Sequence, residues 1–204
     1  MILFNVKDNS TMGDMKQKIK QVAINLFYKK GYYATSMSHI AQGSKIQKAS
    51  IYHHYPNKEE ILVDIFRTTI EDLEKSLESH LKVVRGAENR MRAAIHSHIT
   101  FHIERQKEAI IADSELRVLT VNNYKTFIRM RDNYERKFQK VIKEGIDEGI
   151  FKQLDYKIVS YGILTMCTAV CSWFNNAGRL TKDEVAKILA DFIIRGLKGE
   201  SKPV

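Results

Sequence analysis

Apolar residues recur every three to four positions along most of the chain, with polar residues between them. This spacing places the apolar side chains on one face of an α-helix. It predicts helices over residues 14–30, 37–42, 47–54, 57–82, 87–105, 107–118, 121–148, 156–175 and 182–198. No strand is predicted, so we expect an all-α fold of about nine helices.

Glycines and capping residues mark the ends of several of these helices. Gly31 and Gly149 stand where a left-handed residue usually closes a helix. The pairs Asn57–Glu60 and Thr181–Glu184 have the spacing of a capping box. The chain has only two prolines and ten glycines in 204 residues, which favours long helices over a turn-rich sheet.

The predicted helices near the N-terminus form a pattern of their own. Two short helices joined by a tight turn at Gly43 and Ser44 follow one longer helix, as in a helix-turn-helix. We predict a DNA-binding domain over residues 14–57 and a larger helical domain for effector binding and dimerisation over residues 58–204. Either Met12 or Met15 can be the true start, and we expect residues 1–13 to be a disordered tail.

The charge of the chain is unevenly distributed. The formal net charge is +9, and no Asp or Glu occurs from Met15 to Asn57. The same stretch holds Lys16, Lys18, Lys20, Lys29, Lys30, Lys45 and Lys48. A segment of one sign beside surfaces of mixed sign indicates binding to phosphates. A basic surface without a partner is the alternative.

The second short helix has the side chains of a recognition helix. The major groove, about 12 Å wide, admits one helix, which must offer small and polar groups to the bases and phosphates. Such groups are supplied by Gln47, Lys48, Ala49, Ser50, Tyr52 and His53. We expect Ile51 and Tyr55 to face inward, and Thr35 or Ser36 to cap the preceding helix where a phosphate can dock. The alternative is that Tyr52, His54 and Tyr55 are ordinary residues of a helical bundle.

The N-terminal segment closely resembles the TetR family of transcriptional regulators. The resemblance covers residues 15–66 and rests on Gly31-Tyr32, Ala34-Thr35-Ser36-Met37, Ile40-Ala41, Ile46, Ser50-Ile51-Tyr52-His53-His54-Tyr55 and Asn57-Lys58-Glu59. It implies a homodimeric repressor that a small-molecule effector releases from DNA, with no cofactor. It also implies DNA contacts by Thr35, Lys48, Ser50, Tyr52, His53 and Lys58, and we add Ser36, Gln47 and Ala49 to these.

Two residues depart from the family pattern in the turn of the helix-turn-helix. Lys45 stands where the family usually has Gly, and a Lys with positive φ costs free energy. Gln47 stands where the family usually has Ser, and Gln is a poor N-cap. These two changes bear on the geometry of the turn and on base preference.

The last two predicted helices are the expected dimer surface. A dimer reads two half-sites of a pseudo-palindrome about 34–36 Å apart, and in TetR-like proteins the C-terminal pair of helices forms a four-helix bundle across the dimer axis. The candidate interface residues are Tyr161, Leu164, Thr168, Trp173, Ile188, Phe192 and Ile193. The alternative is that they close the core of one subunit.

The C-terminal half resembles family members that respond to acyl-CoA or related lipid thioesters. This resemblance rests on Ser114-Glu115-Leu116-Arg117, Trp173-Phe174 and Gly178-Arg179-Leu180-Thr181. A tunnel for the acyl chain has as candidate lining residues His98, Phe101, Arg117, Tyr124, Phe127, Met130, Tyr134, Met166 and Val170. Ordinary core packing is the alternative for the apolar ones, and a surface ion pair is the alternative for Arg117 and Arg131. A multidrug-efflux regulator that senses aromatic or cationic compounds is the alternative function.

Other classes of protein find little support. The uncharged run from Ile158 to Gly178 contains several Ser, Thr and Asn residues, so a buried helix is expected there rather than a membrane span. Cys167 and Cys171 predict neither a disulfide nor a metal site, which fits the cytoplasm. His98 and His102 are spaced to share a metal, but no third ligand is evident, and no metal is expected.

No catalytic motif is present, so we expect no enzyme activity. The alternative is a helical acyl-CoA-binding protein or enzyme, and turnover of an acyl-CoA would favour it. An architectural DNA-binding protein without an effector is disfavoured, because some 140 residues lie outside the DNA-binding part.

Overall fold

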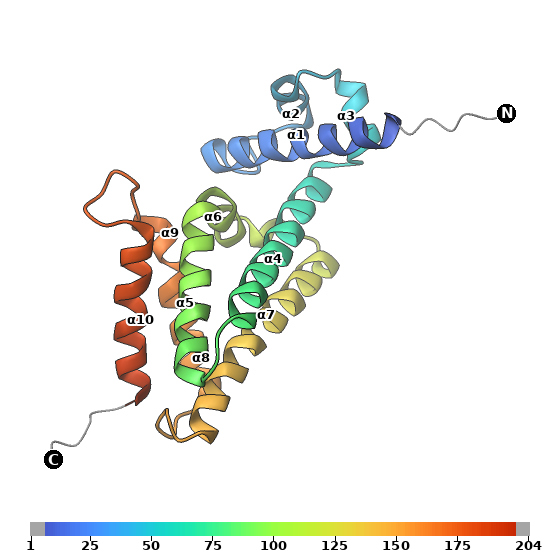
Figure 1. Cartoon of the computed structure of the whole chain (residues 1–204). Coiled ribbons are helices and arrows are strands. Elements are labelled where there is room, and N and C mark those ends of the chain that lie inside the picture. The colour runs from blue at the N-terminus through green and yellow to red at the C-terminus, as the bar shows by residue number, and fades with distance from the viewer. Residues whose placement is uncertain (1–6, 199–204) are drawn as a thin grey trace, which may run out of the picture.

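The computed structural model describes residues 7–198, and their side chains from residue 13 onward. The described chain is all-α, which confirms the expected fold class (Figure 1). Its elements are α1 (Lys7–Lys30), α2 (Met37–Ser44), α3 (Lys48–His54), α4 (Lys58–Lys82), α5 (Ala87–Glu104), α6 (Gln106–Ser114), the 3-10 turn η1 (Leu116–Val118), α7 (Val121–Asp147), α8 (Tyr156–Thr168), α9 (Val170–Trp173) and α10 (Lys182–Lys198).

The first helix begins earlier than expected. Residues 7–13, expected to belong to a disordered tail, are helical, while residues 1–6 lie outside the described residues. Extending a helix that already exists fixes one residue for each hydrogen bond gained, which is easier than starting one. No proline stands in the way between Lys7 and Asp14.

Two of the predicted long helices are interrupted. The segment expected to be helical from 107 to 118 divides into α6 and η1, and the one from 156 to 175 divides into α8 and α9 at Ala169. At the second break the N–H of Ser172 bonds to the carbonyl of Ala169, three residues back, and the Ser172 hydroxyl donates to the same carbonyl. Such local bonds compete with the regular helical ladder.

Two hydrophobic cores lie at the two ends of α4. The first half of α4 packs against α1, α2 and α3 through residues such as Ile19, Phe27 and Ile51. The second half contributes to a larger core with α5, α7, α8 and α10. Figure 1 shows α4 running from the N-terminal head into the larger domain, where α5 lies between α10 and α4.

The larger domain also sends residues back to the head. Ile111 of α6 and Phe127 of α7 are buried in the N-terminal core. Phe127 stacks on Phe66 of α4 with ring centroids 4.9 Å apart. None of the helices within residues 7–198 is long and apolar enough to cross a membrane.

Candidate nucleic-acid interface and ligand site

The turn between α2 and α3 is built by caps at both of its ends. Ser36 caps α2: its hydroxyl accepts the N–H of His39 at 3.1 Å, and its own N–H donates to the His39 ring at 3.2 Å. Lys45 closes α2 in the left-handed conformation, with φ 58° and ψ 43°. Within the described residues, Lys45 is the non-glycine residue whose φ is positive, as its position in the motif predicted. Gln47 precedes α3 without a side-chain cap, also as expected.

Helix α3 presents one face to solvent and anchors the other. Ile51 is fully buried and Tyr55 is 2% exposed, which confirms that both face inward. The outward residues are exposed, namely Gln47, Lys48, Ala49, Tyr52 and His53, and Ser50 is half-buried between the two faces. This face combines a cation, a small residue, an aromatic ring and hydrogen-bond donors, as groove recognition requires.

The segment that precedes α3 carries exposed positive charge. Lys16, Lys18, Lys29, Lys30 and Lys45 are exposed, and no carboxylate occurs in this part of the sequence. Tyr33, which is 79% exposed, lies just before α2 and offers a further aromatic hydroxyl. The sequence analysis did not select Tyr33, although its position next to the Thr35-Ser36 cap is a usable signal.

Thr35 and Lys58 hold the turn before α2 instead of facing outward. Thr35 is only 1% exposed and its hydroxyl donates to the Gly31 carbonyl at 2.9 Å, which contradicts the expected phosphate contact. The Lys58 ammonium donates to the carbonyls of Tyr32 and Thr35 at 2.7 and 2.6 Å and lies 3.9 Å from the centre of the Tyr32 ring. Burial lowers the pKa of Lys58. Both residues are therefore committed to the scaffold, because tertiary packing uses their polar groups.

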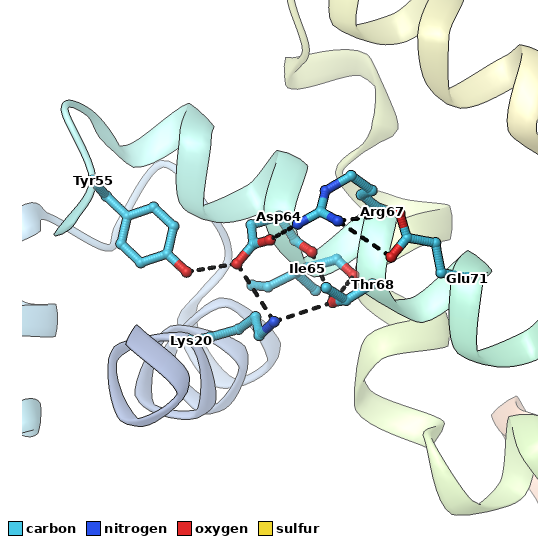
Figure 2. A network of polar contacts seen from close by, with 7 residues as sticks. All are labelled: Lys20, Tyr55, Asp64, Ile65, Arg67, Thr68 and Glu71. Carbon is cyan, nitrogen blue, oxygen red and sulfur yellow. Dashed lines mark hydrogen bonds and ion pairs between the residues drawn. The ribbon is translucent and has the colours of Figure 1, made fainter. Parts of the chain in front are cut away.

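A polar network fixes α3 and α1 to α4 (Figure 2). The Tyr55 hydroxyl donates to Asp64 at 2.6 Å, and the Lys20 ammonium lies 3.4 Å from the same carboxylate oxygen. Arg67 binds the other Asp64 oxygen and also Glu71. Burial by itself raises the pKa of Asp64, but the Tyr55 bond and the two cations outweigh it and lower that pKa. Helix α3 is thus tied to α4 through one ionised carboxylate.

A second set of bonds joins the head to the α6–α7 connection. The Glu115 carboxylate accepts the N–H of Tyr32 at 3.1 Å. The Glu59 carboxylate, at the start of α4, accepts both the N–H of Thr120 and the side-chain amide of Asn123 at 2.8 Å. These bonds connect the α6–α7 connection directly to the head and to the start of α4.

Inside the larger domain, His98 is the centre of a buried polar chain. Its Nδ1 lies 2.9 Å from the Tyr134 hydroxyl and its Nε2 lies 2.9 Å from the Thr168 hydroxyl. The His102 ring is stacked next to it, with centroids 4.3 Å apart. Burial, with a smaller effect of the neighbouring His102, holds the pKa of His98 well below its usual value. Burial, with a smaller effect of the Arg131 charge, lowers the pKa of His102 to about 4.

The nine effector candidates fall into three groups. His98, Phe101, Met130, Tyr134 and Val170 belong to the interior of the larger domain, and Met166 is 38% exposed at its edge. Arg117 and Tyr124 line an open hollow between the α6–η1 segment and α7. Phe127 is buried in the core of the head, because α7 packs against α4 there, so its placement in a ligand tunnel is wrong. The nine candidate residues do not lie together at one site.

The dimer candidates also divide. Tyr161, Trp173, Ile188 and Phe192 are between 53% and 64% exposed, so large apolar surfaces of α8, α9 and α10 face outward. Ile193 is buried in the domain core, which contradicts its expected place at an interface, whereas Thr168 is half-buried with its hydroxyl bonded to His98. Leu164 is half-buried against the same core. The helical repeat explains why some candidates are exposed and others buried, because residues adjacent in sequence point to different sides of a helix.

No metal-binding group is present within the part of the chain whose side chains are described, since no three His, Cys, Asp or Glu side chains gather there. Both nitrogens of His98 are engaged, so the His98–His102 pair is not a metal site. Cys167 and Cys171 are both buried as free thiols.

A helix-turn-helix head on a larger all-helical domain defines a class of helical DNA-binding regulators. Residues 19–65 match the family description "Bacterial regulatory proteins, tetR family". Residues 84–197 match "Tetracyclin repressor-like, C-terminal domain". The chain belongs to the TetR family of transcriptional regulators, as the sequence motif implied.

Three relatives match nearly the whole chain. The transcriptional repressor KstR2 of Rhodococcus jostii is 24% identical over 196 residues, which cover 93% of this chain and 94% of the relative. The fatty acid metabolism regulator protein of Bacillus subtilis is 22% identical over 191 residues, which cover 90% and 98%. The structure of AibR in complex with isovaleryl coenzyme A and operator DNA is 26% identical, covers 90% of this chain and 98% of that chain, and has a TM-score of 0.78.

Proposed function

We propose that this protein is a dimeric repressor that binds a pseudo-palindromic operator through α3. The observation that carries this proposal is the division of α3 into an anchored face and an exposed face of Lys48, Ala49, Tyr52 and His53, within a stretch from Met15 to Asn57 that has no Asp or Glu. The complex of AibR with operator DNA supports the same use of the fold. A regulator of chromosomal genes acts in the cytoplasm, which is the compartment we propose.

The exposed apolar side chains of the C-terminal helices support dimerisation. Tyr161 on α8, Trp173 on α9 and Phe192 on α10 are large apolar residues more than half exposed. Contiguous exposed apolar surface on a protein of this size commonly marks an interface. A dimer formed there would carry two recognition helices, which a two-fold symmetric operator requires.

The test of operator binding begins with selection of bound duplexes from a randomised DNA library, followed by titration of the best sequence. We expect Lys48→Ala and Tyr52→Ala to weaken binding by tenfold or more at fixed salt, with the melting temperature unchanged. Lys187→Ala, an exposed lysine on α10, is the matched control and should bind as the wild type does. Intact affinity in both α3 variants would show that α3 is not the recognition helix.

The proposed effector is an acyl-CoA or a related lipid thioester. AibR was solved with isovaleryl coenzyme A, and the Bacillus subtilis relative is a fatty acid metabolism regulator. The interior of the larger domain is mostly apolar, and its buried polar side chains include the His98 chain, Ser97, His102 and Ser160, a composition that suits an acyl chain with few polar atoms.

The hydrogen bonds between the head and the α6–α7 connection provide a route by which ligand binding would release the protein from operator DNA. A ligand that moves α6 or α7 alters the Glu59 and Glu115 contacts and the orientation of α4. A change in α4 alters the separation of the two recognition helices. Coupling of this kind typically amounts to about 1–3 kcal/mol between the two sites.

A thermal-shift screen distinguishes the effector classes. The probes are acyl-CoAs of increasing chain length, free fatty acids and aromatic cations. A ligand at 100 times its dissociation constant adds about 2.7 kcal/mol of stability. We expect a response graded with acyl-CoA chain length and, in the gel-shift assay, release of operator. A shift from aromatic cations alone would contradict the thioester proposal and favour a multidrug-efflux regulator.

A further inference from the structure

His102 carries a buried nitrogen that the fold leaves unused. The residue is 9% exposed, and its Nδ1 is buried without a hydrogen-bond partner in the described chain. His98, one turn earlier on α5, is satisfied on both nitrogens. Ser44 and His54 carry comparable atoms, but they lie in the head, and the comparable Arg90 Nε lies 3.2 Å from the Glu144 carboxylate. A buried polar atom without a partner costs free energy, so a partner that arrives with a ligand would recover it.

The state of His102 limits what that partner can be. Burial, with a smaller effect of the Arg131 charge, lowers the pKa of His102 to about 4, so the imidazole is neutral at pH 7. A neutral imidazole has one donor and one acceptor nitrogen. Its natural partner is therefore an uncharged polar group such as a carbonyl.

The charge of Arg131 on α7 acts on the His102 ring, and further side chains of α7 lie on the same flank as Arg131. Tyr124, Ile128 and Arg131 follow the i, i+4, i+7 spacing that places them on one flank of the helix. Tyr124 is 43% exposed and lines the open hollows near the start of α7. Arg117 lines one of these hollows and Lys125 the other.

The surface around Tyr124 has an excess of positive charge. Arg117 lines one of its hollows, Lys125 and Arg129 line the other, and Arg131 lies farther along α7; all four are exposed, and no ion pair engages them within residues 13–198. The exposed carboxylates of Asp113 and Asp132 lie in the same stretch and offset only part of this charge. A cluster of arginines beside an exposed aromatic ring suits a phosphorylated ligand with a stacking base.

We propose that His102 anchors the thioester carbonyl of an acyl-CoA whose phosphates lie on Arg131 and the cations around Tyr124. The inference rests on the proposed effector class and names its polar anchor. The order of Phe101 and His102 on α5 and Arg131 on α7, from the buried interior to the surface, matches that ligand. The apolar interior at Phe101, 6.0 Å from His102 between ring centroids, faces the acyl chain, the imidazole faces the carbonyl, and the guanidinium faces the phosphates.

The test measures dissociation constants of octanoyl-CoA and free CoA for the full chain and for paired variants. His102→Asn keeps a polar atom near the Nδ1 position and should bind octanoyl-CoA within threefold of the wild type. His102→Gln moves that atom toward the Nε2 position, and His102→Phe removes it. Both should weaken octanoyl-CoA by tenfold or more and leave free CoA within twofold.

Arg131→Gln should weaken octanoyl-CoA and free CoA alike. The matched controls are Arg136→Gln, on a different face of α7 from Arg131, and His96→Gln, a half-buried residue of α5 that contacts Asp183. Both controls should bind as the wild type does. Should His102→Phe fail to fold, His102→Gln decides the same question.

The outcomes separate the two proposals. If folded His102→Gln binds octanoyl-CoA as the wild type does, His102 is not the anchor, although the effector class stands. If the wild type binds no octanoyl-CoA, both the anchor and the effector class are wrong. Operator binding in the gel-shift assay is independent of either result and tests the regulator function alone.

Discussion

Phe66 of α4 and Phe127 of α7 stack with ring centroids 4.9 Å apart, and this contact joins the head to the larger domain. Both rings are buried, Phe66 at 2% and Phe127 at 8% exposure. Removing a large buried side chain forfeits its transfer free energy and leaves a cavity. We expect Phe127→Ala to lower the free energy of unfolding by about 3–5 kcal/mol, measured by denaturant titration.

The same contact belongs to the core of the head and not to a ligand tunnel. Phe127→Leu, which retains most of the apolar volume, should therefore leave the affinity for any effector unchanged. A selective loss of effector binding by a stably folded Phe127→Leu variant would place this ring in the ligand site after all.

The carboxylate of Asp64 makes the attachment of α3 dependent on pH. The folded pKa of Asp64 lies below its unfolded value of about 3.9. The ionised group therefore stabilises the fold above the unfolded pKa, and this contribution is lost as pH falls through the folded pKa. The advantage in melting temperature of the wild type over Asp64→Asn should be full at pH 6 and should shrink as pH falls below about 4.

Other carboxylates also have lowered pKa values, so the comparison requires a matched control. Asp132→Asn changes an exposed carboxylate on α7 and should melt in parallel with the wild type throughout. A constant difference between the wild type and Asp64→Asn across this pH range would show that the carboxylate charge is not what holds α3.

The scaffold role of Lys58 can be separated from a phosphate contact by the salt dependence of DNA binding. Lys58→Gln removes bonds to the carbonyls of Tyr32 and Thr35. The Tyr32 carbonyl also accepts the N–H of Thr35, so the Thr35 carbonyl is the acceptor that loses its partner. Leaving a buried acceptor unsatisfied typically costs about 1–3 kcal/mol, so the melting temperature should fall. The slope of log affinity against log salt should remain unchanged, whereas loss of a phosphate contact would reduce it by about one.

Lys45 is strained by its left-handed backbone. Only glycine and, less readily, asparagine adopt this conformation at little cost, and the penalty for other L-residues is about 1–2 kcal/mol. Lys45→Asn should raise the melting temperature, and the same substitution at the exposed Lys48, in regular α3, should not. A lower melting temperature in Lys45→Asn would mean that the lysine side chain makes a compensating contact.

Local sequence signals predicted the head and the boundaries of most helices. The Gly31 and Gly149 ends have the expected positive φ, and the Thr181–Glu184 box is complete, with bonds of 3.2 and 2.8 Å. Asn57 caps α4 by accepting the N–H of Glu60. These features depend on neighbours within four residues, which a sequence pattern can report.

The errors arise from contacts between segments distant in the sequence. No proline or glycine marks the break at Ala169, beside the Thr168 hydroxyl that meets His98 from another helix. Thr35 has the residue type of a phosphate contact, but Lys58 and Gly31 use its polar groups. The sequence indicated His102 only as a possible metal ligand, because a sequence does not show that its Nδ1 lacks a hydrogen-bond partner.

The continuity of α4 ties the two parts of the molecule into one unit of unfolding. Its residues 61–66 complete the core of the head, and its residues 70–77 complete the core of the larger domain. A fragment cut within α4 would leave one of these apolar stripes exposed to water. We therefore do not expect the head to fold as a separate module. A substitution that destabilises the larger domain should also lower the fraction of molecules able to bind DNA.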